Sequence, residues 1–442
     1  MSDQLVLTPT LDGRVQQVSY SSLNTHRACP QSWLYRYGYR LEQDVEASSP
    51  YATIGSWWSV LRAAEAIERG RQHDSLVPGL MPGELAFTEG ETTLSFQTET
   101  VTVQRVISAA GSWFDRQSAE YREEFADTLG QPLVERLSAM LELWSNENRE
   151  RFEKEHPLGV EVFVERELPN TATEGTPATK MIGFIDEVYL DADRNMVVIR
   201  DHKALKNLGN ATSAFDDLMD SQLQLYAWLA APRFKELGLA TPRAVAYDRT
   251  RSQAPKSPVL TASGGLSKSV TDYDRMTYLR WAETDTATEQ IEAYVAEHGE
   301  KLGAAVCQQM LDMPAGQLWG KLGEFYVSGA KAGQSKFGVY EYDPKVSEAL
   351  SSPEERAKWH SRTLRPVQKN VIAAHLRAAV DTALDLRQTA ERAKRSGDTS
   401  RNLTRRGCQF CDFAKICRAQ LVGGTSGEYD LPSLGLRLRP EK

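Results

Sequence analysis

The chain has 442 residues, of which 41% are hydrophobic and 25% charged, a composition that excludes fibrous, mucin-like and wholly disordered proteins. Its 52 basic and 60 acidic residues give a formal net charge of -8, so any contact with a polyanion needs a local basic patch. The opening stretch Met1–Gly13 lacks the basic start and apolar run of a signal peptide, and no window reaches the roughly 18 apolar residues of a membrane helix. We therefore expect a cytoplasmic protein without membrane contact.

The first third of the chain has helical patterning. A serine-capped start leads into aromatic residues at helical spacing between Ser19 and Leu41, and a second helix is expected to begin near Gly55. Residues 105–155 are rich in Ala, Leu, Glu and Arg at helical spacing. These patterns predict an N-terminal helical segment over 1–55 and a mainly helical region over 56–158.

The pattern then changes to strands. Apolar residues alternate over Gly159–Leu168 and Lys180–Leu190, and a turn at Asp191–Asn195 leads into a third strand, Met196–Ile199. A helix is expected over Asp216–Leu237, bent or broken at Pro232. Together these elements predict an α/β core over 159–240.

The remaining sequence predicts peripheral elements. We expect a mainly helical insertion over 241–400, with a flexible loop near 250–270 where Ser, Pro, Gly and Lys are frequent. A short cysteine-rich segment covers 401–421, and the Gly- and Pro-punctuated residues 422–442 predict a flexible tail.

Charged residues interrupt the apolar faces of two predicted strands. Asp186 shares a strand face with apolar side chains, and on the next strand Asp201 and Lys203 extend an apolar stripe, about 7 Å apart. Buried carboxylates are costly unless they are paired or bound to metal. Two acids and a lysine suit a hard divalent cation such as Mg²⁺ or Mn²⁺ and an activated water, whereas a buried salt bridge among the three is the alternative.

Two polar residues share one face of the following helix. Gln222 and Tyr226 are four positions apart within a helical pattern. They are compatible with hydrogen bonding to a neighbouring site or phosphate, or with an ordinary core tyrosine beside a partly exposed glutamine.

The five cysteines are too few for a disulfide scaffold, but three of them are clustered. Cys408, Cys411 and Cys417 form a C-x2-C-x5-C pattern, and a soft cation or cluster needs a fourth sulfur. Cys29, followed by Pro30 in a helix-like segment, is a better candidate than Cys307, which we expect to be an ordinary buried thiol. The spacing alone fits zinc as well as iron, and unligated reduced thiols are the alternative.

The order of these motifs resembles a known family. The chain has Ser19-x-Ser21 leading to Cys29-Pro30, then Gly183-Phe184-Ile185-Asp186, Asp201-His202-Lys203, Gln222-x-x-x-Tyr226 and the cysteine cluster. This order is similar to that of the RecB-type nucleases of the PD-(D/E)xK superfamily. It resembles most the branch with an iron-sulfur cluster between the chain ends, which includes CRISPR-associated RecB-like exonucleases, bacteriophage exonucleases and the AddB nuclease domain.

The resemblance implies a fold and an activity. It implies an α/β restriction-endonuclease-like core, a central mixed sheet flanked by helices, with large helical insertions and an iron-sulfur staple joining the N- and C-terminal segments. It also implies a metal-dependent DNA exonuclease in recombination, repair or end processing, with single- or double-stranded DNA ends as substrate, in a bacterial or phage-infected cell.

The resemblance also implies roles for individual residues. Asp186 and Asp201 would bind Mg²⁺ or Mn²⁺, with the backbone carbonyl of His202 as a further ligand, while Lys203 acts on the water nucleophile. Gln222 and Tyr226 would position the lysine or the DNA backbone. The 4Fe-4S cluster would be held by the four cysteines, Cys29, Cys408, Cys411 and Cys417.

One position departs from the family pattern. The family has a histidine four residues after a glycine on the helix before the strands, where this chain has Ser59 after Gly55. Water or another acid would then have to complete the ligands of the metal ion, and Glu165 is a candidate. The departure also favours an alternative, a catalytically weak or inactive DNA-binding or assembly subunit on a nuclease scaffold.

A local basic patch precedes the cysteine cluster. Seven basic residues and two acidic ones lie between Arg387 and Arg406. Its first half equally fits a solvated helix end, whereas Arg401, Arg405 and Arg406, next to the cluster, are predicted to contact the DNA backbone. The chain has no G-x4-G-K-[ST] phosphate loop, so a built-in helicase motor is not expected. Processive resection of DNA would then need a separate helicase or recombination partner, or a topological link between the protein and its DNA.

Overall fold

The computed structural model describes residues 15–43, 49–82, 101–206, 222–254, 285–302, 359–409, 411–423 and 428–439, with shorter stretches such as 5–6, 86–89 and 92–95. The fold and the site are built from these residues.

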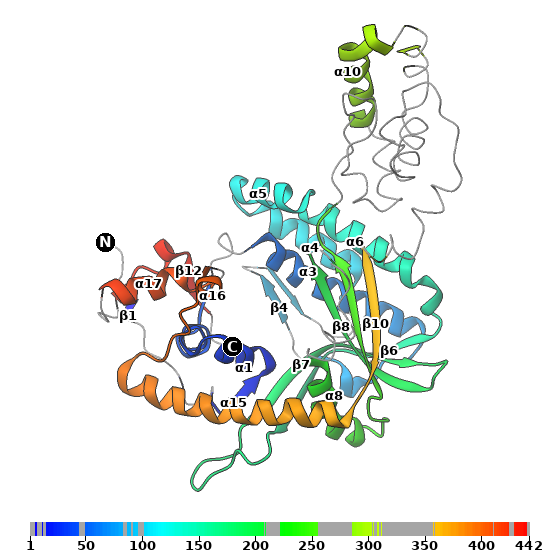
Figure 1. Ribbon diagram of the computed structural model, residues 1–442. Helices are drawn as coiled ribbons and strands as arrows, with labels where there is room; N and C mark the ends of the chain where they lie inside the picture. Colours follow the sequence, from blue (N-terminus) through cyan, green and yellow to red (C-terminus); the bar gives the residue numbers. More distant parts are fainter. Residues whose placement is uncertain are drawn as a thin grey trace.

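A mixed six-stranded sheet forms the centre of the fold (Figure 1). Its strand order is β10-β9-β8-β7-β2, and β6 pairs with β7. The strands are β2 (Gln17–Ser19), β6 (Glu155–Glu167), β7 (Lys180–Asp191), β8 (Met196–Leu205), β9 (Ala244–Arg251) and β10 (His360–Pro366). Helices cover the sheet, which confirms the expected α/β architecture.

The central strands form an antiparallel meander followed by a parallel crossover. β6, β7 and β8 pair antiparallel in sequence order, and the turn between β7 and β8 is closed by Asp191, whose carboxylate accepts the backbone N–H of Arg194 at 3.0 Å. Helix α8 (Gln222–Glu236) then returns the chain to β9, which pairs parallel to β8. Pro232 lies inside α8, which continues through it. The predicted start of this helix, 216–221, lies outside the described residues.

One face of the sheet is covered by a tryptophan-rich helical layer. The buried side chains of this layer include Trp57, Trp58, Trp113 and Trp144, and they pack around Val160 of β6. The layer consists of α3 (Pro50–Gln72), α4 (Val103–Asp115), α5 (Ala119–Leu129) and α6 (Leu133–Asn148), with the hairpin β4 (Ala86–Glu89) and β5 (Thr92–Ser95) also in the region 56–158. Short helical turns lie at Pro78–Leu80 and Arg149–Arg151.

The opposite face packs against α8 and the chain ends. Val162, Ile185, Ile199 and Val245 of the strands share a core with Leu229 of α8, and this core extends to the terminal helices. These helices are α1 (Tyr20–Ala28), α2 (Pro30–Trp33) with the π-helical turn η1 (Leu34–Gly38), α15 (Lys369–Ser396), α16 (Arg405–Gln409) and α17 (Ala414–Gly423). Figure 1 shows α15 running beneath the sheet toward the terminal segments.

The C-terminal residues are more ordered than predicted. In the predicted flexible tail, β12 (Leu436–Leu438) pairs antiparallel with β3 (Leu41–Gln43), and β11 (Glu428–Tyr429) pairs with β1 (Leu5–Val6). A 3-10 turn (Pro432–Leu434) lies between β11 and β12. Leu431 and Leu436 are buried and anchor this segment to the core. A flexible tail would have no such buried side chains.

The sheet extends beyond the predicted 159–240 core. β2 comes from the N-terminal segment, and β9 and β10 both come from the predicted helical insertion. The range 241–400 also contains the helices α10 (Asp285–Leu302) and α15. Most of the predicted loop near 250–270 lies outside the described residues. Cys307 is half-buried rather than fully buried.

No helix in the described ranges is long and apolar enough to span a bilayer.

Candidate active site

The candidate active site lies where two neighbouring strands part. The β7–β8 ladder runs from Asp191↔Met196 to Glu187↔Arg200. One step further in this register Asp186 faces Asp201, after which β7 pairs with β2 while β8 continues alongside β9. The two acids predicted from the sequence are therefore brought together at the end of a shared ladder.

Asp201 pairs with the lysine of its own motif. Lys203 Nζ lies 2.9 Å from Asp201 Oδ1, and the Lys203 side chain is 40% exposed. The Asp201 carboxylate is buried, and its Oδ2 atom has no hydrogen-bond partner among the described residues. A buried carboxylate oxygen without a donor is costly, so it is suited to a cationic ligand.

Asp186 is held by the backbone of the facing strand. Its Oδ2 accepts the backbone N–H of His202 at 2.8 Å. Burial raises the pKa of Asp186 well above its usual value, and the neighbouring carboxylates Asp201 and Glu161 raise it further. Lys203 and the His202 amide act in the opposite direction but do not overcome this effect. The site thus brings together three carboxyl groups, Asp186, Asp201 and Glu161, beside the single ammonium of Lys203. The role of the His202 carbonyl stays a prediction.

Glu161 is a third acid that the sequence reasoning missed. It lies on β6 between the pairs Val160↔Glu187 and Val162↔Ile185, which puts it level with Asp186. Burial raises its pKa to about 7, and its Oε1 accepts from Ser59 Oγ at 3.4 Å. Its φ of +45° is in the left-handed region, which is strained for a non-glycine residue and recurs at functional sites.

Ser59, which stands where the resemblance predicts a histidine, contacts an acid. Ser59 lies on α3, which packs across β6 and β8, and its hydroxyl donates to Glu161. The carboxylate that completes the cluster comes from β6. The other candidate, Glu165, is exposed and pairs with Lys180 at 3.1 Å. Because Glu165 lies opposite Ile182, four residues before Asp186 on β7, the structure does not bring it to the other acids.

Helix α8 brings Gln222 and Tyr226 to the same site. The Tyr226 hydroxyl interacts with Gln222, and the side chain is within electrostatic range of Asp186, Asp201 and Lys203. Burial raises the pKa of Tyr226 to about 12, so the phenol remains protonated and can donate.

The glycine of the G-x-x-D motif makes room for this tyrosine. A Cβ atom at Gly183 would lie 2.6 Å from Tyr226 Cε1, well inside van der Waals contact. The absence of a side chain at Gly183 lets the ring approach β7 closely, three residues before Asp186.

The arrangement supplies three acids, one ammonium and one phenol around an opening in the sheet. Such a set can bind a hard cation, orient a water molecule and donate to an anionic oxygen. Within the described ranges no group of three or more His, Cys, Asp or Glu side chains is arranged to hold a metal ion. The carboxylates of Asp186 and Asp201 instead accept from His202 and Lys203.

Comparison with known families agrees with this geometry. The model of the PD-(D/E)XK nuclease superfamily matches residues 17–418, which is most of the chain. This chain belongs to the PD-(D/E)XK nuclease superfamily. A search of curated proteins found no significant match. Members of the superfamily are hydrolases that use divalent metals such as Mg²⁺ or Mn²⁺, and a nuclease fold implies DNA as the substrate.

A network of paired charges lies directly behind the nuclease site. Glu187, next to Asp186, accepts from Arg69 at 2.9 Å, and its other oxygen lies 3.0 Å from both Arg200 and His202 Nε2. Burial acts to raise the pKa of Glu187, but Arg200 and Arg69 hold it well below its usual value. Glu155, Asp248, His360 and Arg362 extend the network to β10. It fixes His202, whose amide holds Asp186.

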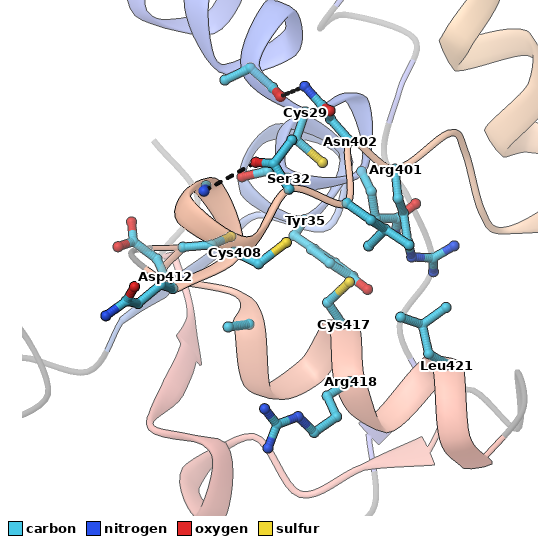
Figure 2. Close-up of a pocket in the computed structure, with 18 of the residues that line it drawn as sticks. Cys29, Ser32, Tyr35, Arg401, Asn402, Cys408, Asp412, Cys417, Arg418 and Leu421 are labelled. Atoms are coloured by element: carbon cyan, nitrogen blue, oxygen red, sulfur yellow. Dashed lines mark hydrogen bonds between the residues drawn. The ribbon is translucent and has the colours of Figure 1, made fainter.

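The four predicted cluster cysteines line one pocket of the nuclease. This pocket has a volume of about 900 Å³ and lies between the N-terminal helices and α16–α17. Figure 2 shows Cys29 and Cys417 directing their sulfur atoms toward each other across it, with Cys408 at its side. The walls are joined by backbone hydrogen bonds such as Gln31 N to Ser400 O at 3.1 Å.

The predicted DNA-contacting arginines are placed differently from expectation or are not described. Arg401 is 12% exposed and donates to Asp398 and Gln420, at 2.8 Å each, inside the cysteine pocket. It is therefore not displayed on an open surface. Arg405 and Arg406 begin α16, but their side chains lie outside the described residues.

Proposed function

We propose that this nuclease is a metal-dependent DNA exonuclease of the RecB type, acting in DNA recombination, repair or end processing. The observation that carries the proposal is the buried Asp201, which pairs with Lys203 through one oxygen and leaves the other without a partner, opposite Asp186. A charge arrangement of this kind is unfavourable in the protein alone and becomes favourable when a cation and an anionic substrate oxygen are bound.

The donor atoms at the site are of the kind that a hard divalent cation prefers, although the carboxylates are not gathered around one point in this structure. Asp186, Asp201 and Glu161 would hold Mg²⁺ or Mn²⁺, because carboxylate oxygens are the ligands these ions prefer. When bound, the ion supplies a Lewis acid for the phosphate and lowers the pKa of a bound water. Glu161 takes the place of the family's helix histidine, and Ser59 holds it by a hydrogen bond.

The remaining residues act on water and substrate. Lys203 is partly exposed and anchored to Asp201, so its ammonium can hold the attacking water and stabilise the hydroxide that forms. The Tyr226 phenol, with its pKa raised to about 12, donates to a phosphate oxygen without losing its proton. Gln222 orients this phenol through their shared hydrogen bond.

The cysteine pocket supports a 4Fe-4S cluster held by Cys29, Cys408, Cys411 and Cys417. All four thiols line the same space of about 900 Å³, although they come from opposite ends of the chain. A polynuclear cluster needs more room than a single zinc ion, which needs four sulfurs about 2.3 Å from one point, and the pocket has that room. Bound there, the cluster links the termini. Iron and acid-labile sulfide near 4:4 per chain, with a brown colour, support it; colourless protein with one zinc contradicts it.

A nuclease assay with end-labelled and circular DNA tests the activity. Purified protein with Mg²⁺ or Mn²⁺ should shorten linear single- or double-stranded DNA from its ends and leave covalently closed circles intact. Asp201→Asn should lower the rate at least roughly 10³-fold, because it removes both the metal ligand and the partner of Lys203. The matched control is Glu165→Gln, an exposed acid on β6 outside the site, which should keep full activity. Retained activity in Asp201→Asn contradicts the assignment.

The same assay separates the alternative function. DNA binding without cleavage under Mg²⁺, Mn²⁺ or Co²⁺ would indicate a non-catalytic DNA-binding or assembly subunit. Addition of ATP and a separate helicase would then test whether the chain acts in a larger resection complex.

A further inference from the structure

Two phenylalanines are exposed on the strands that carry Glu161 and Asp186. Phe163 is 46% exposed and Phe184 is 41% exposed, and they are the aromatic members of the described set of exposed large apolar side chains. They form a directly opposed cross-strand pair on β6 and β7. Their ring centroids are 5.3 Å apart with an interplanar angle of 54°. The two rings thus make one continuous aromatic surface.

The sheet beneath these rings is firmly fixed. The alternate positions Val162, Val164 and Ile185 are each at most 2% exposed and belong to the core shared with α8. The alternation of the strands therefore sends both phenylalanines to the opposite, solvent-facing side. A rigid aromatic surface of this kind loses little conformational freedom when a ligand covers it.

The pair lies one strand repeat from the acids. Phe163 is two residues after Glu161, and Phe184 is two residues before Asp186, which is about 7 Å along each strand. On the far side of the rings, Glu165 and Lys180 form an exposed ion pair. An exposed aromatic surface so close to phosphate-processing residues is well placed for the base attached to the bound backbone.

We propose that Phe163 and Phe184 form a stacking platform for an unpaired nucleobase beside the scissile phosphate. The inference rests on the proposed function and adds a substrate class to it: single-stranded or frayed DNA ends. Base–aromatic stacking tolerates any sequence, because every base has a π-face, and this matches an enzyme that degrades DNA progressively. A paired base keeps its own stack and cannot reach the platform without opening.

Abasic substrates test the platform directly. The probes are two single-stranded oligonucleotides that differ only in an abasic site next to the bond cleaved first. With the wild-type protein and Mg²⁺, removal of this base should lower kcat/KM about 10-fold, mainly through KM. In Phe163→Leu/Phe184→Leu the same removal should cost less than 2-fold, because no ring is left to stack. Phe163→Tyr/Phe184→Tyr should restore the 10-fold sensitivity.

The controls separate stacking from folding and from other uses of the surface. Leu438→Ala removes an equally exposed apolar side chain on β12, and it should behave as wild type. Circular dichroism and thermal melting establish that each variant is folded, and the abasic comparison is internal to each variant. Wild-type protein that cleaves DNA but is indifferent to the abasic site overturns the platform alone. Equal sensitivity of wild type and the leucine variant also overturns it.

The remaining outcomes are also decisive. If wild type cleaves no DNA, the proposed function fails, and the platform is then judged by fluorescence anisotropy with the same oligonucleotides and Ca²⁺. A change of oligomeric state in the leucine variant, with unchanged abasic sensitivity, identifies the surface as a contact between copies of the chain and overturns the platform.

Discussion

Asp186 and Glu187 are adjacent on β7, yet their surroundings shift their pKa values in opposite directions. Burial raises the pKa of Asp186, and two further acids raise it more. Glu187 is also buried, but Arg200 and Arg69 hold its pKa well below its usual value. Burial alone therefore does not distinguish a functional carboxylate from a structural one. The balance of partner charges does.

The comparison predicts that replacing the structural acid, Glu187, destabilises the fold more than replacing a functional acid. Glu187→Gln leaves Arg69 and Arg200 buried without their shared carboxylate, so the free energy of unfolding should fall by about 3–5 kcal/mol. Urea denaturation followed by circular dichroism measures it. A loss below 1 kcal/mol would mean that the network contributes little to stability.

The functional acid should behave in the reverse way. Glu161→Gln removes a metal ligand but relieves repulsion, so DNA cleavage should fall roughly 10²-fold while the metal-free protein becomes no less stable. Initial rates at saturating Mg²⁺ and thermal melting in EDTA measure the two effects. Ser59→Ala removes only the hydrogen bond to Glu161 and should keep most of the activity, because the Glu161 carboxylate remains. Normal cleavage by Glu161→Gln would remove Glu161 from the site.

The pKa of Glu161 predicts a pH dependence of stability. Its pKa is raised from 4.5 to about 7 in the folded protein, so between these values the folded state binds more protons than the unfolded state. Its contribution to the free energy of unfolding therefore falls as pH rises from 4.5 to 7, by about 1–3 kcal/mol. Melting curves of metal-free wild type and Glu161→Gln should converge at pH 4.5 and separate by pH 8. Parallel curves would contradict the shift.

The smallest effect is expected at the chain ends. Glu42 on β3 accepts from Arg437 and Arg439 at 3.0 Å each, but all three side chains are partly exposed. Exposed pairs contribute about 0–1 kcal/mol, so Glu42→Gln should change the melting temperature by only a few degrees and the cleavage rate not at all. Salt titration provides the check, since high salt should erase the difference.

The site residues that could be predicted from the sequence are charged residues at positions where the strand pattern calls for apolar ones. Asp186, Asp201 and Lys203 interrupt apolar alternation, so strand periodicity alone identified them as unusual. Glu161 does not break this pattern, because it lies between Val160 and Val162, where an alternating strand normally has a solvent-facing residue. Only the register of β6 against β7 shows that it lies level with Asp186, and the sequence alone did not separate it from Glu165.

The edge of the sheet was missed for a related reason. β10 has the sequence His360-Ser-Arg-Thr-Leu-Arg-Pro366, which shows no apolar alternation. Its inward-facing groups are charged or imidazole side chains, and Arg362 pairs with Glu155 while His360 lies 3.4 Å from Asp248. The partners that make this strand favourable are about 100 to 200 residues away, so only the tertiary structure explains it.

The contact between the chain ends has a consequence for biosynthesis. His26 hydrogen-bonds to Thr389 at 3.0 Å across 363 residues, and β3 pairs with β12, which lies far from it in the sequence. Contacts of such high sequence separation form late in folding. During translation, residues 20–43 cannot complete this packing until residues 389–438 have emerged from the ribosome. A chain that ends before these residues should therefore leave α1 and β3 without their packing partners.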